Sequence, residues 1–334
     1  MRLMVRMPNW IGDAVMATPA LAAIRRAFPA AQITAVANPL VAELFVHHPD
    51  CDHVLRFVER SGRGGLGDLW RFSRILRRER FDLAVLLQNA FEAAVMAVLA
   101  GIPRRAGYRT DGRALLLTHS VPAGDKKHGL HHIDYYLQLL HQLGLPSADR
   151  QLRLALTGDE EEMAAELLGP GEWVAINPGA SYGTAKRWIP ERFAAVADSL
   201  AAEYGVKVVL TGGPGELEIG ADIARGMHSQ VLNLIGRTSV RELMAVLGRC
   251  RLVVTNDSGP MHIAAALGVP IVAVFGPTDH TTTSPLGDRC RIVRHPVDCA
   301  PCMLRECPID HRCMTRVTED DVLVAARELL GDGR

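Results

Sequence analysis

The sequence predicts an α/β protein of two doubly wound domains, and three features lead to this prediction. The chain has 334 residues, which exceeds the size at which one hydrophobic core usually stops growing. Short apolar runs alternate with amphipathic helix patterns in its first half, as in a parallel sheet with helices on both faces. The alternation starts again near Trp173. We therefore expect two Rossmann-like domains that face a central cleft, with ligands at the carboxyl ends of the strands.

In the first half, each of four expected strands is followed by a helix pattern. The strands span residues 3–7, 32–37, 53–57 and 83–87, and the helices span 14–28, 39–47, 67–79 and 90–99. Pro19 falls inside the first helix pattern and is expected to kink it. A further helix over residues 133–143 is stopped by Gly144 and Pro146.

The second half repeats this order. Its strands are expected at 173–177, 207–211, 231–234, 252–255 and 271–275, and its helices at 190–203, 216–226, 240–247 and 260–267. The acidic stretch 158–172 marks the join between the two units. We expect domains over residues 1–155 and 156–316. The last helix, in 317–334, could belong to either unit, and one possibility is that it packs back on the first domain.

The composition is that of a soluble globular protein, with 48% hydrophobic residues. The longest apolar run, 93–100, has roughly half of the ~18 residues that a membrane span needs. The first residues lead directly into a strand and lack the long apolar region of a signal peptide. These features predict a cytoplasmic location.

The net charge is zero, but the charges are unevenly divided. Residues 1–155 carry 20 Lys and Arg against 13 Asp and Glu, a net charge of +7, and the remainder carries 17 against 24, a net charge of −7. A basic first half suits an anionic partner, such as a phosphorylated substrate or a membrane surface. The alternative is that the two domains merely differ in surface charge.

The stretch Gly62-Arg63-Gly64-Gly65-Leu66-Gly67 matches the dinucleotide pattern G-x-G-x-x-G, and Asp82 follows twenty residues after Gly62. The pattern requires its glycines after the first strand of a unit and its acid at the end of the second. Here the glycines follow the third strand, and Asp82 begins the next one. A flexible loop is predicted, without an NAD site.

Two strand-to-helix loops have the composition of a phosphate site. Residues 179–186 offer backbone amides and the hydroxyl of Ser181, and they end in Lys186-Arg187. The spacing differs from that of a P-loop, which places Lys directly after its second glycine. A polar loop with a solvated lysine is the alternative. Residues 211–216 are a weaker example of the same kind.

The segment 255–262, Thr-Asn-Asp-Ser-Gly-Pro-Met-His, connects a strand to a helix that opens at Pro260. The free amides and the dipole of a helix N-terminus attract an anion. Asp257 or Ser258 could simply be the N-cap, and His262 a packed helix residue. Two polar residues, a glycine and a histidine at one strand end exceed what capping requires.

Asp13 follows the first strand and lies where the first helix opens. It could serve as an N-cap. The alternative is a carboxylate at the carboxyl end of a strand, facing the cleft and available as a general base.

Four of the seven cysteines lie close together, at Cys299, Cys302, Cys307 and Cys313. Four thiols at this spacing could enclose a structural zinc ion or hold an iron–sulfur cluster. Reduced, partly buried cysteines are the alternative, and the metal is left unassigned.

Together these segments resemble the ADP-heptose:lipopolysaccharide heptosyltransferases, inverting enzymes of the GT-B fold that form glycosyltransferase family 9. The resemblance covers nearly the whole chain. Its most specific strings are residues 9–19, 177–183, 186–188, 256–262 and 275–278. The Ala-Ser-Tyr-Gly loop and the cysteine-rich segment look most like the heptosyltransferase II group, which adds the second inner-core heptose.

The resemblance implies a role for each matching residue. Asp13 would be the base that deprotonates the acceptor hydroxyl. Ser181 and Lys186 would contact the donor diphosphate, and Asp257 would hold heptose hydroxyls. The residues implied to line the phosphate turn are Ser258, Gly259 and His262. Some members carry Thr in place of Ser181 and Ser258, which keeps the hydroxyl.

The implied reaction moves heptose from ADP-heptose to a phosphorylated lipid A–core precursor at the cytoplasmic face of the inner membrane. It needs no catalytic metal or other cofactor, and no nucleic acid takes part. The first domain would bind the acceptor, and the second would bind the ADP-sugar. The basic run 56–80, with Arg104, Arg105, Lys126 and Lys127, is expected to approach the phosphates and carboxylates of the acceptor. The alternatives are heptosyltransferase I or another member with a different acceptor, a nucleotide-sugar 2-epimerase, and a protein that senses nucleotide-sugar without turnover.

Overall fold

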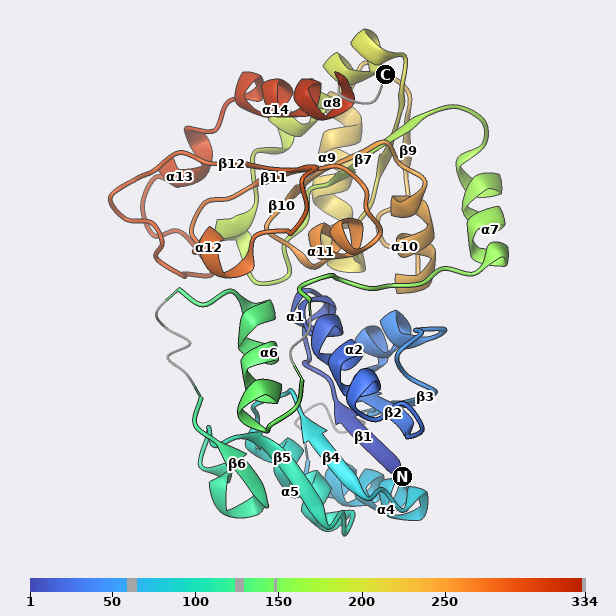
Figure 1. Cartoon of the computed structure of the whole chain (residues 1–334). Helices are drawn as coiled ribbons and strands as arrows, with labels where there is room; N and C mark the ends of the chain where they lie inside the picture. Colours follow the sequence, from blue (N-terminus) through green and yellow to red (C-terminus); the bar gives the residue numbers. More distant parts are fainter. Residues whose placement is uncertain (59–64, 124–128, 147–148, 332–334) are drawn as a thin grey trace. The chain divides into compact units, whose positions relative to one another are not determined.

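The computed structural model describes residues 1–58, 65–123, 129–146 and 149–331 (Figure 1). The chain divides into two compact units, Met1–Ala155 and Leu156–Arg334. Each contains a six-stranded parallel sheet flanked by helices. The prediction of an α/β protein with two doubly wound sheets is confirmed. In the part of the chain that the structure describes, no helix has the length and apolar character needed to cross a membrane.

The sheet of the first unit has the order β3-β2-β1-β4-β5-β6. Its strands are β1 (Arg2–Arg6), β2 (Gln32–Ala37), β3 (His53–Arg56), β4 (Leu83–Leu86), β5 (Arg104–Tyr108) and β6 (His119–Val121). The strand order reverses between β1 and β4, which pair directly. In such a sheet, ligands bind outside the carboxyl ends of the strands at this reversal.

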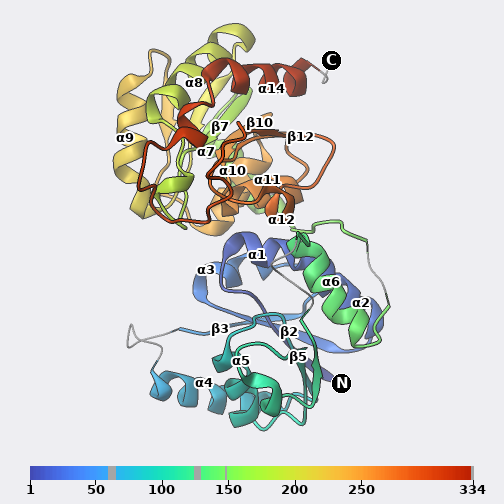
Figure 2. The same cartoon turned by 90° about the vertical axis from the view of Figure 1, so that its left-hand side faces the viewer.

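The helices of the first unit are α1 (Ile11–Met16), α2 (Thr18–Ala27), α3 (Pro39–Ala42), α4 (Leu66–Glu79), α5 (Phe91–Leu99) and α6 (His132–Gln142), with short 3₁₀ turns at Glu43–Phe45 and Arg113–Leu116. Helix α6 packs beside α2 (Figure 2). The predicted kink at Pro19 is a break between α1 and α2. Pro19 lies in the first turn of α2, where its missing N–H removes no helical hydrogen bond.

Some positions discussed from the sequence lie outside the described residues, namely Gly62 to Gly64 of the glycine-rich stretch and Lys126 and Lys127. Asp82 immediately precedes β4, and its carboxylate accepts a hydrogen bond of 2.7 Å from the amide of Arg2. It therefore supports the start of two adjacent strands.

The sheet of the second unit has the order β12-β11-β10-β7-β8-β9. Its strands are β7 (Trp173–Asn177), β8 (Lys207–Leu210), β9 (Val231–Asn233), β10 (Leu252–Asn256), β11 (Ile271–Val274) and β12 (Cys290–Val293). This is the same topology as in the first unit, and the reversal lies between β7 and β10. Thr255 pairs with Asn177 there, so the two carboxyl ends are neighbours.

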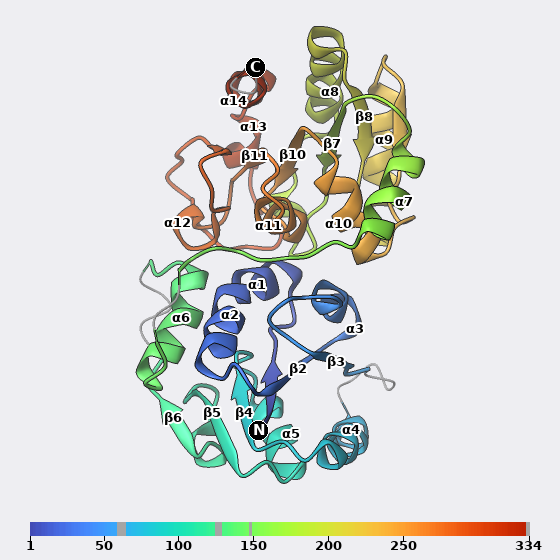
Figure 3. The same cartoon turned by 45° about the vertical axis from the view of Figure 1, so that its right-hand side comes forward.

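The longer helices of the second unit are α7 (Gly158–Leu168), α8 (Pro190–Tyr204), α9 (Leu217–Gly226), α10 (Val240–Gly248), α11 (Gly259–Ala266) and α14 (Glu319–Gly331); α12 (His280–Thr283) and α13 (Arg312–Thr315) are single turns. The acidic stretch interpreted as a join forms α7, which begins at a capping box made by Thr157 and Glu160. Helix α7 packs against α10 (Figure 3).

Helix α14 is part of the second unit. It lies along α8 and contacts β10, β11 and β12 (Figure 2). Val322, Ala326 and Leu329 are buried in the same core as Val254 and Val274. The apolar face of α14 is therefore buried against the sheet of the second unit.

Candidate active site

Two buried asparagines shape the carboxyl edge of the second sheet at the reversal of strand order. Asn177 ends β7, and its side-chain amide donates to the carbonyl of Thr211, 2.8 Å away. Asn256 ends β10; its amide donates to the carbonyl of Pro178 at 2.7 Å, and its oxygen accepts from the amide of Trp188 at 3.0 Å. These bonds tie the start of the loop after β8 to the end of β7, and the loop after β7 to the end of β10.

Asp257 and Lys186 form an ion pair at this edge. Lys186 Nζ lies 2.6 Å from Asp257 Oδ2, and their side chains are only 14% and 6% exposed. The hydroxyl of Thr278, which follows β11, donates to the same oxygen at 2.7 Å. Residues from three separate loops therefore meet around one carboxylate. An ammonium group has three donors, so Lys186 can keep this bond and contact an anion as well.

The turn after β10 leads into α11 with Ser258 as its N-cap. The Ser258 side chain makes no capping bond; its hydroxyl lies 3.2 Å from that of Thr255 and donates to Asn177 Oδ1 at 3.3 Å. Gly259 and Pro260 follow in the first turn, and His262 is buried. The first amides of α11 are thus not capped by that hydroxyl and can bind an anion.

The loop after β7 carries Ser181 and Lys186. Ser181 is exposed, whereas Lys186 ends a short 3₁₀ turn, Thr184–Lys186, and points to Asp257. The structure therefore brings Lys186, Asp257 and Ser258 to the carboxyl ends of two neighbouring strands. They are three of the six residues that the sequence singled out there, with Ser181, Gly259 and His262.

Glu216 ends the loop 211–216, and the sequence analysis gave this acid no role of its own. Its carboxylate accepts the amide hydrogen of Gly213 at 2.7 Å. A Cβ built on Gly179 would lie 1.7 Å from Glu216 Oε1, and one on Gly212 would lie 2.5 Å from Oε2. Burial raises the pKa of Glu216 above its usual value, opposed by the Gly213 amide and by Arg187. The two glycine loops thus make room for one carboxylate.

Asp13 lies in the first unit, in the first turn of α1 after β1. Trp10 is the N-cap of that helix, so the interpretation of Asp13 as an N-cap is wrong. Its Oδ1 lies 2.9 Å from His132 Nδ1 and accepts a 3.4 Å bond from the hydroxyl of Tyr136. Burial raises the pKa of Tyr136 well above its usual value, and the charge of Asp13 adds to this. Helix α6 therefore holds one oxygen of the carboxylate.

The four clustered cysteines are free thiols with graded exposure, from exposed Cys299 to buried Cys313. Burial, together with a smaller effect of the nearby Cys299, Cys307 and Cys302, raises the pKa of Cys313 to about 11. Over the described residues, no group of three or more His, Cys, Asp or Glu side chains is arranged to hold a metal ion.

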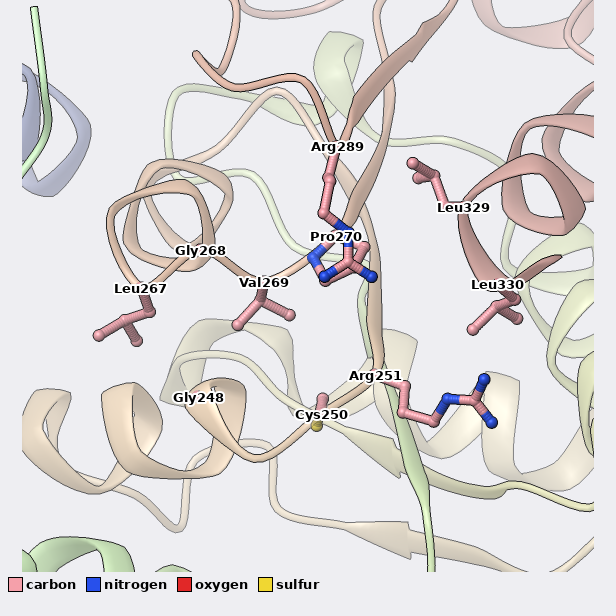
Figure 4. Close-up of a pocket in the computed structure, with 10 residues that line it drawn as sticks. All are labelled: Gly248, Cys250, Arg251, Leu267, Gly268, Val269, Pro270, Arg289, Leu329 and Leu330. Atoms are coloured by element: carbon pink, nitrogen blue, oxygen red, sulfur yellow. The ribbon is translucent and has the colours of Figure 1, made fainter. Parts of the chain in front are cut away.

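A pocket of about 260 Å³ in the second unit lies away from this site (Figure 4). Arg251, Pro270 and Arg289, which line it, immediately precede β10, β11 and β12. It therefore opens at the amino ends of the strands. Because ligands of doubly wound sheets bind at the carboxyl ends, we place the chemistry at the Asp257 edge and not in this pocket.

Comparison with known proteins shows to which family this two-sheet protein belongs. The sequence pattern of glycosyltransferase family 9 (heptosyltransferase) matches residues 69–312. The chain belongs to this family. It is 30% identical to lipopolysaccharide heptosyltransferase 2 of Escherichia coli (strain K12) over 88% of each chain. It is 29% identical to lipooligosaccharide heptosyltransferase 2 of Campylobacter jejuni over 99% of this chain and 98% of the relative.

Solved structures agree with membership of family 9. A glycosyl transferase family 9 protein from Veillonella parvula matches with a TM-score of 0.89 at 26% identity, covering 99% of this chain and 98% of its own. The ADP-heptose lipopolysaccharide heptosyltransferase II of E. coli matches with a TM-score of 0.86 at 27% identity and 99% coverage of both chains. The two parallel sheets are those of the GT-B fold.

Proposed function

We propose that this family 9 glycosyltransferase moves L-glycero-D-manno-heptose from ADP-heptose to heptosyl-Kdo2-lipid A in lipopolysaccharide inner-core biosynthesis, with inversion. The observation that carries the proposal is the meeting of Lys186, Asp257 and the N-terminus of α11 at the strand reversal of the second sheet. Similarity to heptosyltransferase 2 proteins over most of the chain supports the choice of donor and acceptor.

On the donor side, Lys186, Ser181 and the first amides of α11 hold the diphosphate. Ser258 and Gly259 form the turn that brings these amides to the phosphates, and His262 supports the turn from the buried side of α11. Asp257 accepts hydrogen bonds from the heptose hydroxyls. Glu216 suits the ribose, because a carboxylate beside glycine loops commonly accepts from sugar hydroxyls.

The chemistry is a single displacement at the anomeric carbon through an oxocarbenium-like state. The acceptor oxygen forms a bond to this carbon as the bond to the ADP oxygen breaks, and Asp13 takes the proton of the acceptor hydroxyl. The electron pair leaves with ADP. Its growing charge is stabilised by fixed donors, namely Lys186 and the amides of α11. ADP needs no protein acid to leave, and we assign no metal or other cofactor to the reaction.

Asp13 suits the role of base because helix α6 holds its carboxylate in place. His132 and Tyr136 both engage Oδ1, which fixes the orientation of the carboxylate towards the acceptor hydroxyl. A general base must stand within hydrogen-bond reach of the proton that it takes. In this proposal the acceptor site belongs to the first unit, and the enzyme works in the cytoplasm at the face of the inner membrane.

The deciding experiment offers ADP-heptose to the purified protein with either Kdo2-lipid A or its monoheptosylated form. Transfer only to the monoheptosylated acceptor is expected. Transfer only to Kdo2-lipid A would identify the heptosyltransferase I reaction instead. The anomeric configuration of the product, read by NMR, tests inversion.

Two other activities were compatible with twin Rossmann-like domains. A nucleotide-sugar 2-epimerase would convert a nucleotide-sugar without any acceptor, and a sensor would bind it without turnover. Family 9 membership favours transfer. Incubation of ADP-heptose alone is expected to leave it unchanged, whereas an epimerase would produce an isomer.

A further inference from the structure

The cysteine-rich segment 299–313, called here the docking segment, lies directly against the donor loop 179–186. The carbonyl of Arg305 accepts a 2.9 Å hydrogen bond from the amide of Ala185. The carbonyl of Ala185 lies 2.7 Å from Nε2 of His311. Both backbone polar groups of Ala185 are therefore held by the docking segment, one residue before Lys186.

Tyr182 provides a second connection between the two segments. Its hydroxyl donates to the carbonyl of Met303 at 2.8 Å. The guanidinium carbon of Arg305 lies 5.4 Å from the centroid of its ring, and Lys186 Nζ lies 5.2 Å from the same centroid. Cations at this range are attracted by the ring. Tyr182 thus links the docking segment to the ammonium group that pairs with Asp257.

Gly183 shows how close the two backbones are. A Cβ built there would lie 2.2 Å from the carbonyl oxygen of Arg305 and 2.8 Å from its carbonyl carbon. The backbone of Gly183 is extended, with φ 165°, so space and not conformation requires glycine. Any side chain at this position must push the loop away from the docking segment.

The docking segment is itself fixed to the second unit at both ends. The amides of Cys302 and Met303 donate to the carbonyl of Pro277 at 3.0 and 2.9 Å. Cys313 is buried in the core beneath α14. Pro277 precedes Thr278, whose hydroxyl contacts Asp257. These contacts make the docking segment a rigid surface on one side of the donor loop.

We propose that the docking segment positions the donor loop so that Lys186 meets the diphosphate of the donor. Gly183, Tyr182, Arg305 and His311 act as positioning residues in this arrangement. The inference rests on the proposed function, because the contact between Lys186 and the donor is part of that proposal. It gives the cysteine-rich segment a role in donor affinity that is independent of any bound metal.

The test measures the Kd for ADP and the KM values for ADP-heptose and acceptor in four variants. Gly183→Ala is expected to raise the Kd for ADP about tenfold, because the loop must shift. His311→Ala loses one hydrogen bond and is expected to raise it about three- to tenfold. His311→Gln keeps a donor of similar reach and should recover most of that loss. Gly158→Ala is the matched control, since a Cβ there meets nothing within 4 Å.

A role in positioning predicts that the KM for ADP-heptose rises with the Kd, while the KM for the acceptor stays within about twofold, because only ground-state donor binding is lost. If Gly183→Ala unfolds, the comparison of His311→Ala with His311→Gln tests the positioning role instead. Lys186→Ala, titrated alongside, separates the two proposals. If Lys186→Ala weakens ADP binding but Gly183→Ala and His311→Ala do not, the docking proposal alone is overturned. If Lys186→Ala also binds ADP normally, the donor role of Lys186 is overturned, and this inference with it.

Discussion

At the scale of single residues, Asp13 carries the most specific part of the proposed chemistry. Asn has the same shape but cannot take a proton, so Asp13→Asn is expected to lower kcat by about 100- to 10,000-fold. The Kd for ADP should stay within about twofold, because the proposed donor residues lie in the second unit. Transfer assays and calorimetry measure the two quantities.

Tyr136→Phe is a milder variant that serves as a control for Asp13→Asn. It removes one hydrogen bond to Asp13 Oδ1 and keeps the ring and the base, so a loss of only about three- to tenfold in kcat is expected. Transfer by Asp13→Asn at a rate close to that of the wild type would remove Asp13 from the mechanism.

The pair formed by Lys186 and Asp257 should also contribute to stability. Asp257→Asn leaves the largely buried Lys186 without its carboxylate, and removal of one partner of a buried pair costs about 3 kcal/mol. The double variant Lys186→Met with Asp257→Asn is expected to recover much of this free energy of unfolding while staying inactive. Urea denaturation measures both. Strictly additive losses would show that the two side chains do not interact.

The sequence located these proposed donor-site residues but not all of the side chains around them. Lys186, Asp257 and Ser258 stand in loops whose composition indicates an anion site. Thr278 and Glu216 lie in stretches that the sequence analysis quoted, but they were given no role of their own, because a lone hydroxyl or acid after a strand is common in sequences. The partners of Asp13 were missed for a different reason: His132 and Tyr136 lie more than a hundred positions further along the chain.

At the scale of elements, the start of α14 offers a test of how this helix is anchored. Asp321 accepts hydrogen bonds from the amide and hydroxyl of Thr318 and lies 3.0 Å from His295 Nε2. The Thr318 amide, followed by His295, lowers the pKa of Asp321 from 3.8 to about 2. Because the pKa of Asp321 is lower in the folded than in the unfolded protein, Asp321 makes its full contribution to the free energy of unfolding above pH 3.8. This contribution is lost as the pH falls towards 2.

Asp321→Asn is therefore expected to lower the urea midpoint at pH 7, and its difference from the wild type should shrink as the pH falls from about 4 to about 2. Asp320→Asn, in the same turn but exposed, is the matched control, since it shares the helix dipole without these contacts. Equal losses in the two variants would assign the effect to the dipole alone.

Strand prediction succeeded where an apolar run was present and failed where it was not. The central strands of both sheets were predicted because they are buried on both faces. Strands β5, β6 and β12 were missed. Arg104-Arg105-Ala106-Gly107-Tyr108 has no apolar run, and its β structure depends on pairing with β4. The acidic start of α7 resembled a linker, although Thr157 and Glu160 form a capping box there.

At the scale of the whole molecule, the excess positive charge of the first unit predicts electrostatic recognition of the acceptor. Helix α4 exposes three arginines, Arg71, Arg74 and Arg78. The guanidinium carbon of Arg74 lies 4.9 Å from the centroid of the Trp70 ring. Reversal of all three to Glu is expected to lower kcat/KM for the phosphorylated lipid acceptor at least about tenfold, without a change in ADP affinity. The loss should diminish at high salt.

The matched control reverses three exposed arginines of the second unit, Arg225, Arg249 and Arg289. It applies the same change of net charge away from the proposed acceptor side. If both triple variants lose activity equally, the effect is one of net charge. If activity on the lipid acceptor is unchanged in the α4 variant, the basic run has no role in acceptor recognition.

The sequence by itself determined the two doubly wound sheets, because buried strands and amphipathic helices can be recognised from the local spacing of their apolar residues. It also determined which loops offer amides, hydroxyls and a lysine to an anion. The tertiary structure decided which side chains meet: Lys186 with Asp257 and Thr278, Asp13 with His132 and Tyr136, and the cysteine-rich segment with the donor loop. Such contacts join residues far apart in the chain, and only the pairing order of the strands brings them together.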